Sequence, residues 1–449
     1  MVSESVIVIG AGIAGLTAAY QLSKFGVDVR VLEAAQQIGG RMVTDTINGY
    51  VIDSGAQFLS SAYPIIKDLI TETGLARDFI KTSPWAAIRR NGAIHRFRYD
   101  DIFSSVRNGL LGWGEWFSLG WNIMRQARKL INLPVSDYSA WAEFDTQYAT
   151  DWYNEQYGTW MTEYMIEPLL EGFYFQTPEE TSCALPMAVS AFLLHRSKTM
   201  TLWEGIGSLT KALASRLRIS LDEAVEEIIV EADSVRIQTN KRELRADRVI
   251  LAVPAHTAKI LYRQSGDIES ALMDTPYSST LNLVLGTARE WALPETLRDV
   301  YGLLIPRKER KHIAAIAVET AKCSDRTQFG HLINVMLDGT SGTEMIGWDE
   351  EKILQTLQSE LDELLPGISR CIIFQKYYRW LHAEPKSPIG RSRNIAAYRR
   401  NITPDSRVLL AGDYMGMPFT EGAAETGQWA ASHLIKSNNG FPGSANQTR

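Results

Sequence analysis

The chain has 449 residues and a formal net charge of −6 at pH 7, so it has no general electrostatic attraction to nucleic acid or to an anionic membrane. Its length allows about two to four domains, and small-molecule chemistry is the function class that its composition favours. The three cysteines, Cys183, Cys323 and Cys371, form no C-x-x-C pair, which predicts neither a disulfide framework nor a metal site and fits a cytoplasmic protein. No stretch has the pattern of a signal peptide or of a membrane span, so we expect neither.

The N-terminal residues predict a βαβ unit. Residues 5–10 have a continuous apolar strand pattern, residues 11–26 a helical pattern that ends in glycine, and residues 27–33 an alternating strand pattern. A glycine-rich turn with the letters "GAGIAG" joins the first strand to the helix. In this context the turn is typical of a dinucleotide-binding site, because the helix N-terminus then points at a pyrophosphate.

Each glycine of this turn has its own role. Gly10 permits the tight turn, Gly12 lets the backbone approach the pyrophosphate, and Gly15 lets the helix pack on the strand. Ala14, in the first helical turn, is a further predicted cofactor contact. Glu33 ends the second strand, where its carboxylate would accept hydrogen bonds from a ribose hydroxyl and repel a 2′-phosphate. The sequence therefore predicts a cofactor whose adenosine ribose is not phosphorylated.

The next segment decides between a nicotinamide and a flavin. The stretches "LEAAQQIGGRMVT" (32–44) and "GYVIDSGAQFL" (49–59) resemble the opening of the flavin-dependent amine oxidase superfamily, which includes monoamine oxidases, protoporphyrinogen oxidases and carotenoid desaturases. The resemblance implies FAD as the cofactor. Gly40 would give a second close backbone approach to the diphosphate, and Arg41 would add a cation with forked donor geometry.

Two later segments resemble the rest of this flavin site. Residues 407–432, "RVLLAGDYMGMPFTEGAAETGQWAAS", resemble the closing flavin motif, and residues 222–255 resemble the strands that complete the nucleotide-binding sheet. The resemblance implies that Val225 contacts adenine through its backbone and that Gly412 and Asp413 meet the ribityl and phosphate region. The helix that follows would present backbone N–H groups that stabilise the reduced flavin, those of Glu421, Gly422 and Ala423.

Together these segments predict an α/β fold with three parts. The first is a discontinuous FAD-binding domain of the Rossmann type (GR2-like), and the others are an α+β substrate domain and a helical insert. We place the FAD-binding domain in residues 1–80, 201–260 and 376–436, the substrate domain in 81–99 and 261–375, the helical insert in 100–200 and a flexible tail in 437–449.

The helical insert favours one branch of the superfamily. Residues 149–183, "ATDWYNEQYGTWMTEYMIEPLLEGFYFQTPEETSC", resemble the protoporphyrinogen oxidase-like branch most closely, and the likeness covers nearly the whole chain. Two departures leave the substrate open. Asn282 stands where amine oxidases hold a lysine near the flavin. Ala86 stands near the position of an arginine that, in the protoporphyrinogen branch, pairs with a substrate propionate.

Three residues are predicted to face the flavin and to act in catalysis: Asn282, Trp380 and Phe419. An aromatic plane such as that of Trp380 can align a flat substrate by offset stacking. The alternatives are that Asn282 only satisfies hydrogen bonds of its strand and that Trp380 is an ordinary packing residue. The covalent cysteine and the tyrosine cage of monoamine oxidases have no counterpart here, which implies noncovalent FAD and an incomplete cage.

Two other segments allow more than one interpretation. The stretch 89–98 carries four arginines around an Asn-Gly turn, which could bind an anionic substrate group, although solvated strand faces are the favoured interpretation. The helical pattern from residue 110 carries aromatic side chains three to four residues apart, a spacing that predicts a buried core face. Lining of a cavity or contact with a membrane interface are the alternatives for these side chains, Trp113, Trp116, Phe117 and Trp121.

The leading functional hypothesis is an FAD-dependent oxidoreductase. It would abstract hydride from a CH–NH or CH–CH bond of a hydrophobic, cyclic or conjugated small molecule, with oxygen or another carrier as electron acceptor. An amine oxidase that produces imine and hydrogen peroxide is the second hypothesis, and a catalytically silent flavoprotein scaffold is the third. We expect a cytoplasmic protein with no nucleic-acid partner, and peripheral contact with a membrane is an alternative. Substrate, electron acceptor and oligomeric state stay open.

Overall fold

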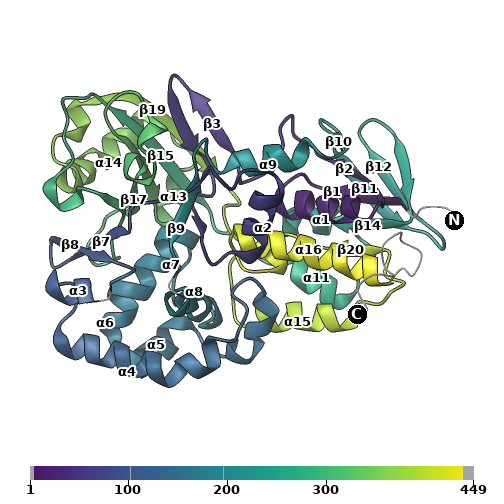
Figure 1. Ribbon diagram of the computed structural model, residues 1–449, viewed down its shortest axis with the longest axis horizontal. Helices are drawn as coiled ribbons and strands as arrows, with labels where there is room; N and C mark the ends of the chain where they lie inside the picture. The colour runs from purple at the N-terminus through teal and green to yellow at the C-terminus, as the bar shows by residue number, and fades with distance from the viewer. Residues whose placement is uncertain (1–4, 102, 196, 438–449) are drawn as a thin grey trace.

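The computed structural model describes residues 5–101, 103–195 and 197–437. Figure 1 shows a long molecule with two differently built ends. One end surrounds a parallel sheet flanked by helices α1 (Ile13–Lys24) and α16 (Thr420–Ser437). The other end places a large, mainly antiparallel sheet over a layer of helices. Apart from Ser437, which ends α16, the predicted tail lies outside the described residues.

The parallel sheet is assembled from distant parts of the chain. Its order is β10 (Ile219–Ser220), β2 (Asp28–Leu32), β1 (Ser5–Ile9), β14 (Arg248–Leu251) and β20 (Val408–Leu410). Every pairing in it is parallel. Helices α1 and α16 cross on this sheet so closely that a Cβ atom at Gly427 would lie 2.0 Å from the Ala14 carbonyl oxygen. The first and last helices of the described chain are therefore packed together at the nucleotide-binding end.

The large sheet has seven strands. Their order is β19 (Ile372–Trp380), β15 (Thr280–Thr287), β18 (Leu332–Leu337), β17 (Ile313–Val318), β16 (Val300–Leu304), β7 (Trp85–Arg90) and β8 (Ala93–Arg98). The boundary that we predicted at residue 376 falls inside β19, which pairs with β15 along its length. That strand is part of the large sheet because its backbone pairs with β15 and continues the antiparallel ladder.

The two faces of this sheet carry side chains of different size. On β17, Ile316 and Val318 join the apolar cluster that includes Leu357 of helix α14 (Glu350–Leu364). Ala315 and Ala317 point to the opposite face, because successive side chains of a strand alternate. Small side chains on that face leave space beside the sheet, and the cavity described below occupies it.

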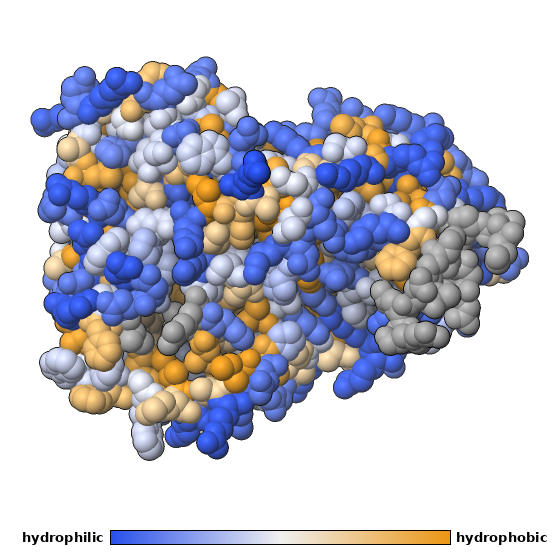
Figure 2. Space-filling model, in the orientation of Figure 1, coloured by the Kyte–Doolittle hydropathy of each residue, from blue (hydrophilic) through white to orange (hydrophobic). Residues whose placement is uncertain are grey.

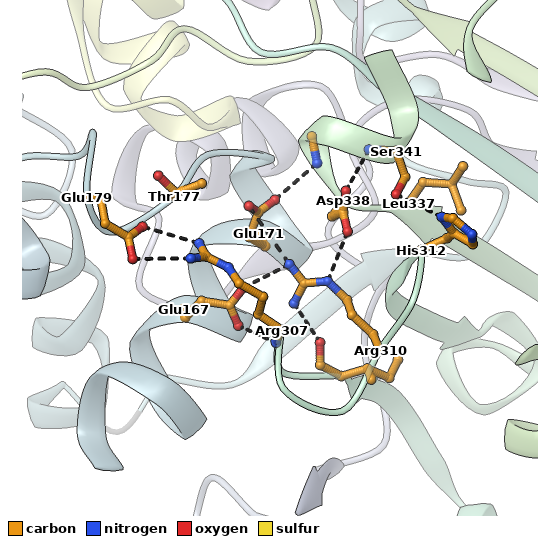
Figure 3. A network of polar contacts seen from close by, with 12 residues as sticks. Glu167, Glu171, Thr177, Glu179, Arg307, Arg310, His312, Leu337, Asp338 and Ser341 are labelled. Carbon is orange, nitrogen blue, oxygen red and sulfur yellow. Dashed lines mark hydrogen bonds and ion pairs between the residues drawn. The ribbon is translucent and has the colours of Figure 1, made fainter. Parts of the chain in front are cut away.

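The layer of helices comes from the predicted insert. It contains α3 (Phe103–Arg107), α4 (Trp113–Leu130), α5 (Ala149–Tyr157), α6 (Thr159–Met161), the π-helical turn η2 (Thr162–Ile166), α7 (Glu167–Tyr174) and α8 (Ala184–Leu194). A buried polar network fastens α7 to the large sheet (Figure 3). In it, the Arg310 guanidinium lies 2.8 Å from Glu167 of α7 and 3.1 Å from Asp338, which follows β18.

The remaining elements connect these layers. The strands are β3 (Thr44–Ile47), β4 (Tyr50–Asp53), β5 (Leu59–Ser60), β6 (Phe79–Lys81), β9 (Thr199–Leu202), β11 (Val225–Val230), β12 (Val235–Thr239) and β13 (Glu243–Ala246). The helices are α2 (Pro64–Glu72), α9 (Gly207–Ala214), α10 (Ala255–Leu261), α11 (Asp267–Met273), α12 (Glu319–Lys322), α13 (Gly339–Met345) and α15 (Arg391–Asn401). Short 3₁₀ turns are η1 (Tyr138–Phe144), η3 (Glu295–Leu297), η4 (Ser324–Arg326), η5 (Ile368–Arg370) and η6 (Asp413–Met415).

Helix α4 does not bury its aromatic side chains as we predicted. Trp113, Phe117 and Trp121 are 62%, 64% and 65% exposed, and Trp116 is half-buried. The expectation of a core face was wrong because α4 forms the outer edge of the helical layer and packs through another face (Figure 1). Within the described ranges, no helix is long and apolar enough to cross a membrane.

Candidate active site

One cavity of about 1660 Å³ runs from the parallel sheet to the layer of helices. It exceeds the range of about 300–1,000 Å³ that is usual for a single small-molecule site. Most of the predicted cofactor residues line it, namely Gly10, Gly12, Ala14, Glu33, Gly40, Arg41, Val225, Gly412, Asp413 and Ala423. The three predicted catalytic residues, Asn282, Trp380 and Phe419, also line it. The fold therefore brings residues from all parts of the chain to one space.

The glycine-rich turn has the geometry of a phosphate cradle. Gly10 has a φ of +102°, and a Cβ atom there would lie 2.6 Å from the Ala252 carbonyl oxygen. A Cβ atom at Gly15 would lie 2.0 Å from the Gly10 oxygen, so this position lets α1 approach the strand. Among the described residues, apart from Gly12 itself, its chain neighbours and the adjacent helix backbone, none has an atom within 4 Å of a Cβ atom at Gly12, which lines the cavity at the start of α1. The open face at Gly12 and the helix N-terminus fit a diphosphate.

Glu33 supports the turn as well as lining the cavity. Its Oε2 atom accepts a hydrogen bond from the Ala11 N–H (2.7 Å), and its Oε1 atom accepts one from the Ala35 N–H (2.9 Å). An ionised carboxylate has about four lone-pair sites, so acceptor capacity remains for a ribose hydroxyl. The residue thus fits the predicted ribose contact and also fixes the backbone around it.

Arg41 and Asp413 form an ion pair at the centre of the cavity wall. The Arg41 Nη1 atom lies 2.5 Å from Asp413 Oδ2 and also donates to the Ala383 carbonyl oxygen (2.8 Å). Tyr277 donates its hydroxyl to Asp413 Oδ1 (2.9 Å). Burial alone would lower the pKa of Arg41, but the Asp413 carboxylate raises it above its ordinary value. Arg41 therefore stays charged where a diphosphate would lie.

The structure adds two groups to this wall that sequence reasoning missed. Glu384 lines the cavity, and burial raises its pKa to about 8 although Arg41 acts in the opposite direction. His256 and His382 stack with ring centroids 3.8 Å apart, and both line the cavity. Burial is the main cause that lowers the pKa of His256. No local sequence signal marks these residues, because the fold alone brings the segment after β19 to Arg41.

The side chains in the first turn of α16 have a mainly structural role. Glu421 is fully buried and accepts hydrogen bonds from the Ile65 and Ile66 N–H groups (3.0 and 2.9 Å), so it caps α2. A Cβ atom at Gly422 would lie 2.3 Å from the Met417 oxygen, which marks a close packing contact. The Ala423 N–H already donates to the Phe419 oxygen (3.0 Å), so it is not a free donor. The helix begins at Thr420, so the N–H groups of Glu421 and Gly422 still belong to its first turn, whereas Ala423 lies one residue beyond the donors that have no intrahelical acceptor.

The three flavin-facing candidates differ in how they are held. The Trp380 Nε1 atom donates to the Ser54 carbonyl oxygen (3.1 Å), which fixes the ring at the end of β19. Phe419 stacks parallel to Tyr63 with centroids 5.5 Å apart. Asn282 is 3% exposed on β15, and its Oδ1 atom has no hydrogen-bond partner among the described residues. Their contacts with FAD and their catalytic roles stay predictions.

The arginine-rich hairpin is mostly paired within the protein. Arg90 lies 2.7 Å from Glu115, Arg89 contacts Glu363, and the Arg96 guanidinium lies 4.6 Å from the ring centre of Trp85. These contacts give the arginines structural roles, but the expectation of solvated strand faces was wrong for Arg89 and Arg90, whose side chains are only 13% and 17% exposed because they pair with carboxylates. Arg98 lines the cavity, where it lies 2.8 Å from Asp100. Ala86, on the neighbouring strand, also lines the cavity.

A buried group of four charges joins the β3–β4 hairpin to the large sheet. Asp53 Oδ2 lies 2.9 Å from the Lys322 ammonium and 3.0 Å from the Arg326 guanidinium, and Glu319 also contacts Lys322. The Lys322 ammonium donates to the carbonyl oxygen of Gln57 (2.9 Å), a residue that lines the cavity. Sequence reasoning missed this cluster, because Asp53 lies far along the chain from the other three members.

Comparison with known proteins agrees with this site. The model of the flavin-containing amine oxidoreductase family matches residues 13–435. Coproporphyrinogen III oxidase of Mycobacterium tuberculosis is 23% identical, over 94% of this chain and 96% of its own length. Protoporphyrinogen oxidase 2 of Arabidopsis thaliana is 22% identical, over 85% and 84%. The structure of cyclohexylamine oxidase from Brevibacterium oxydans aligns with a TM-score of 0.75 at 18% identity, over 96% and 98%.

These findings settle the family and the cofactor together with the fold. The geometry of the glycine turn, Glu33 and the Arg41–Asp413 pair fits FAD, and the contacts of these residues with it stay predictions. None of the three cysteines lines the cavity, and noncovalent binding of FAD stays a prediction. The protein belongs to the flavin-containing amine oxidoreductase family and is an FAD-dependent oxidoreductase.

Proposed function

We propose that the protein abstracts hydride from a CH–NH or CH–CH bond of a hydrophobic, cyclic or conjugated small molecule. Oxygen or another small carrier would then take up the electrons. The observation that carries this proposal is the continuity of the cavity. The same space that is lined by the dinucleotide cradle is also lined by Trp380, Phe419 and the small side chains of β17. A hydrophobic compound can therefore reach the place where the flavin ring would lie.

The residues of the chain orient the substrate and exclude water. FAD, when bound, supplies the chemistry of hydride acceptance. Trp380, fixed by its bond to Ser54, offers a flat surface for a planar substrate. Ala315 and Ala317 give room beside it, and apolar walls favour the neutral form of an amine over its cation. Positioning and desolvation by such groups reduce the need for a dedicated general base.

Anaerobic reduction of the flavin tests this proposal. The FAD-loaded protein is mixed with primary, secondary and cyclic amines, with porphyrinogens and with other reduced heterocycles, and the flavin absorbance is followed. Bleaching by a hydrophobic cyclic or conjugated compound supports the proposal and identifies the bond that is oxidised. Bleaching by simple amines alone, with imine and hydrogen peroxide as products after air is admitted, supports the amine oxidase instead. An absorbance that no compound changes would favour the silent scaffold.

We also propose that the outer face of α4 contacts an anionic membrane surface. Trp113, Phe117, Trp121 and Met124 lie on one side of this helix, and all four are more than 60% exposed. Figure 2 shows apolar side chains along the lower edge of the molecule, where Figure 1 places α4. The same helix exposes three basic side chains near its C-terminal end, Arg125, Arg128 and Lys129. Aromatic residues beside basic ones are typical of a helix that lies in the interface of an anionic bilayer.

Vesicle sedimentation tests this contact. We expect the protein to sediment with vesicles of phosphatidylcholine and phosphatidylglycerol, and replacement of Phe117 and Trp121 by serine to weaken binding by about tenfold or more. Trp203→Ser is the matched control, because Trp203 is 45% exposed and lies outside α4. Equal binding of the two variants, or equal binding to vesicles without the anionic lipid, would contradict the proposal. Self-association through α4 would appear as a dimer in sedimentation velocity without vesicles.

A further inference from the structure

The cavity extends well beyond the residues that would hold FAD. A second group of lining side chains comes from the layer of helices, from α4 to α7 (Figure 1). These side chains are Leu119, Ile123, Gln126, Leu130, Tyr153, Tyr157, Met161, Met165, Ile166 and Leu169. We call the space beneath them the helical branch of the cavity. Because one continuous cavity is lined by both groups, the branch is connected to the flavin end.

Helix α4 separates this branch from the outside. Residues three and four apart lie on one face of a helix, so Leu119, Ile123 and Leu130 share one side. Trp121 and Met124 belong to the opposite, exposed side. The helix is therefore apolar on two sides, and only one of them is covered by protein. An inner face that lines a cavity instead of packing tightly leaves apolar surface available to a ligand.

The chemistry of the branch selects an uncharged and flexible occupant. None of the ten lining side chains named above carries a charge. A charged group placed there would lose its hydration without an ionic partner, whereas methylene groups gain about 0.8 kcal/mol each on burial. Methionine side chains such as Met161 and Met165 are unbranched and adapt to irregular apolar shapes. The branch therefore favours an aliphatic chain over a polar or rigid one.

We infer that the helical branch binds the aliphatic tail of an elongated, amphiphilic substrate whose reacting end lies at the flavin. The inference deepens the proposed function and rests on it only for the position of the reacting end. Polar residues at other parts of the cavity, Arg98, Asp100 and Lys198, leave room for a hydrophilic group outside the branch. The substrate class is thus a long-chain compound that carries an oxidisable CH–NH or CH–CH bond.

Displacement of a fluorescent fatty acid measures binding to the branch without turnover. The FAD-loaded protein is saturated with cis-parinaric acid, which is then displaced by straight-chain alkylamines of increasing length. We expect the affinity to rise about threefold to fourfold for each added methylene group and then to level off when the branch is full. An affinity that does not depend on chain length would overturn the inference.

Two neighbouring substitutions on α4 locate the binding. Ile123→Trp fills the branch and is expected to weaken binding of the longest amines at least tenfold, while binding of the shortest is unchanged. Met124→Trp adds the same ring on the exposed side and is expected to leave the length dependence unaltered. Leu119→Phe is a smaller addition to the inner face and provides the test if Ile123→Trp does not fold. It should shorten the amine chain length at which affinity levels off. Equal behaviour of the Ile123 and Met124 variants would reject the branch as the tail site.

The outcome can be separated from that of the proposed function. Length-dependent binding without bleaching of the flavin by any amine would retain the tail site and count against hydride abstraction from these compounds. Bleaching by short cyclic amines together with length-independent binding would retain the oxidoreductase proposal and reject the tail site.

Discussion

Arg41 connects the cofactor site to the rest of the protein. Its guanidinium pairs with Asp413 at 2.5 Å and bonds the Ala383 carbonyl oxygen, so residues near both ends of the chain meet at one cation. Arginine suits this position because its planar group donates in several fixed directions at once. The sequence motif places this residue near a diphosphate, and the structure shows that it also holds the segment after β19.

Replacement of Arg41 by methionine should weaken FAD binding about tenfold to a hundredfold. Loss of a hydrogen bond to a charged group costs about 1.5–3 kcal/mol, and the Asp413 carboxylate would then repel the diphosphate. Titration of the apoprotein with FAD, followed by flavin fluorescence, measures the dissociation constant. Arg89→Met is the control, because Arg89 lies on the arginine-rich hairpin and pairs there with Glu363 of α14. Equal affinities of the two variants would show that Arg41 does not contact the cofactor.

Glu384 should make the stability of the apoprotein depend on pH. Burial raises its pKa from 4.5 to about 8, so the folded state keeps a proton that the unfolded state has lost between these values. The free energy of unfolding should therefore fall as the pH rises from about 4.5 to about 8. Urea unfolding across this range should show a smaller slope for Glu384→Gln than for the wild type. The exposed control Glu155→Gln should keep the original slope, and the prediction fails if both variants keep it.

At the scale of elements, the turn before α1 and the helix α4 illustrate opposite uses of glycine. In the turn, Gly15 allows the helix to pack against the strand, because a Cβ atom would lie 2.0 Å from a backbone oxygen. In α4, a Cβ atom at Gly120 would have no protein atom within 4 Å. Glycine is thus required at position 15, where a side chain would collide with the backbone. At position 120 no contact requires it, and it only lowers the stability of the helix.

Alanine at these two positions should change stability in opposite directions. Gly15→Ala should lower the free energy of unfolding by about 1–3 kcal/mol and reduce FAD binding, because the new methyl group displaces α1. Gly120→Ala should raise it by about 0.5–1 kcal/mol, because alanine limits the unfolded backbone. Urea unfolding at saturating FAD measures both. A Gly15→Ala variant as stable as the wild type would mean that the turn tolerates a side chain.

For the molecule as a whole, the buried charges around Asp53 join its two ends. Asp53 lies at the end of β4, while Lys322 and Arg326 follow strand β17 of the large sheet. All three side chains are fully buried, so water cannot hydrate either sign of charge while the parts are docked, and each charge depends on its ionic partners. The cluster also fixes the carbonyl oxygen of Gln57 at the cavity wall. The position of this part of the cavity wall therefore depends on the contact between the two ends of the molecule.

Lys322→Met should destabilise the protein by about 3–5 kcal/mol. Removal of the Lys322 ammonium leaves two buried carboxylates, Asp53 and Glu319, with one guanidinium, Arg326, so one buried negative charge is uncompensated. Lys308→Met removes a comparable cation from an exposed pair with Glu163, at 2.6 Å, and should change stability by no more than about 1 kcal/mol. Chemical unfolding of both variants at saturating FAD gives the comparison. Similar losses of unfolding free energy in the two variants would argue against a stabilising role of the buried ion pairs at Asp53.

Local signals in the sequence determined the cofactor end of this protein. The turn "GAGIAG", Glu33 and the segment around Arg41 are contiguous motifs, because phosphate and ribose contacts come from one strand-turn-helix unit. These motifs place the residues correctly along the cavity wall without knowledge of the remaining chain. The same local reasoning failed at Ala423, where the N–H already donates to the Phe419 oxygen, since a shift of one residue in the helix start cannot be seen from sequence.

Only the tertiary structure decided the substrate end and the outer surface. Periodicity shows that α4 has an apolar side, but it does not show whether that side meets protein or solvent, and Trp121 proved to be exposed. Glu384 and the charges around Asp53 come together through contacts between distant segments, so no local pattern marks them. The cofactor could therefore be predicted from short-range sequence motifs. The size of the cavity and the branch beneath α4 depend on how separate layers pack, which long-range contacts alone determine.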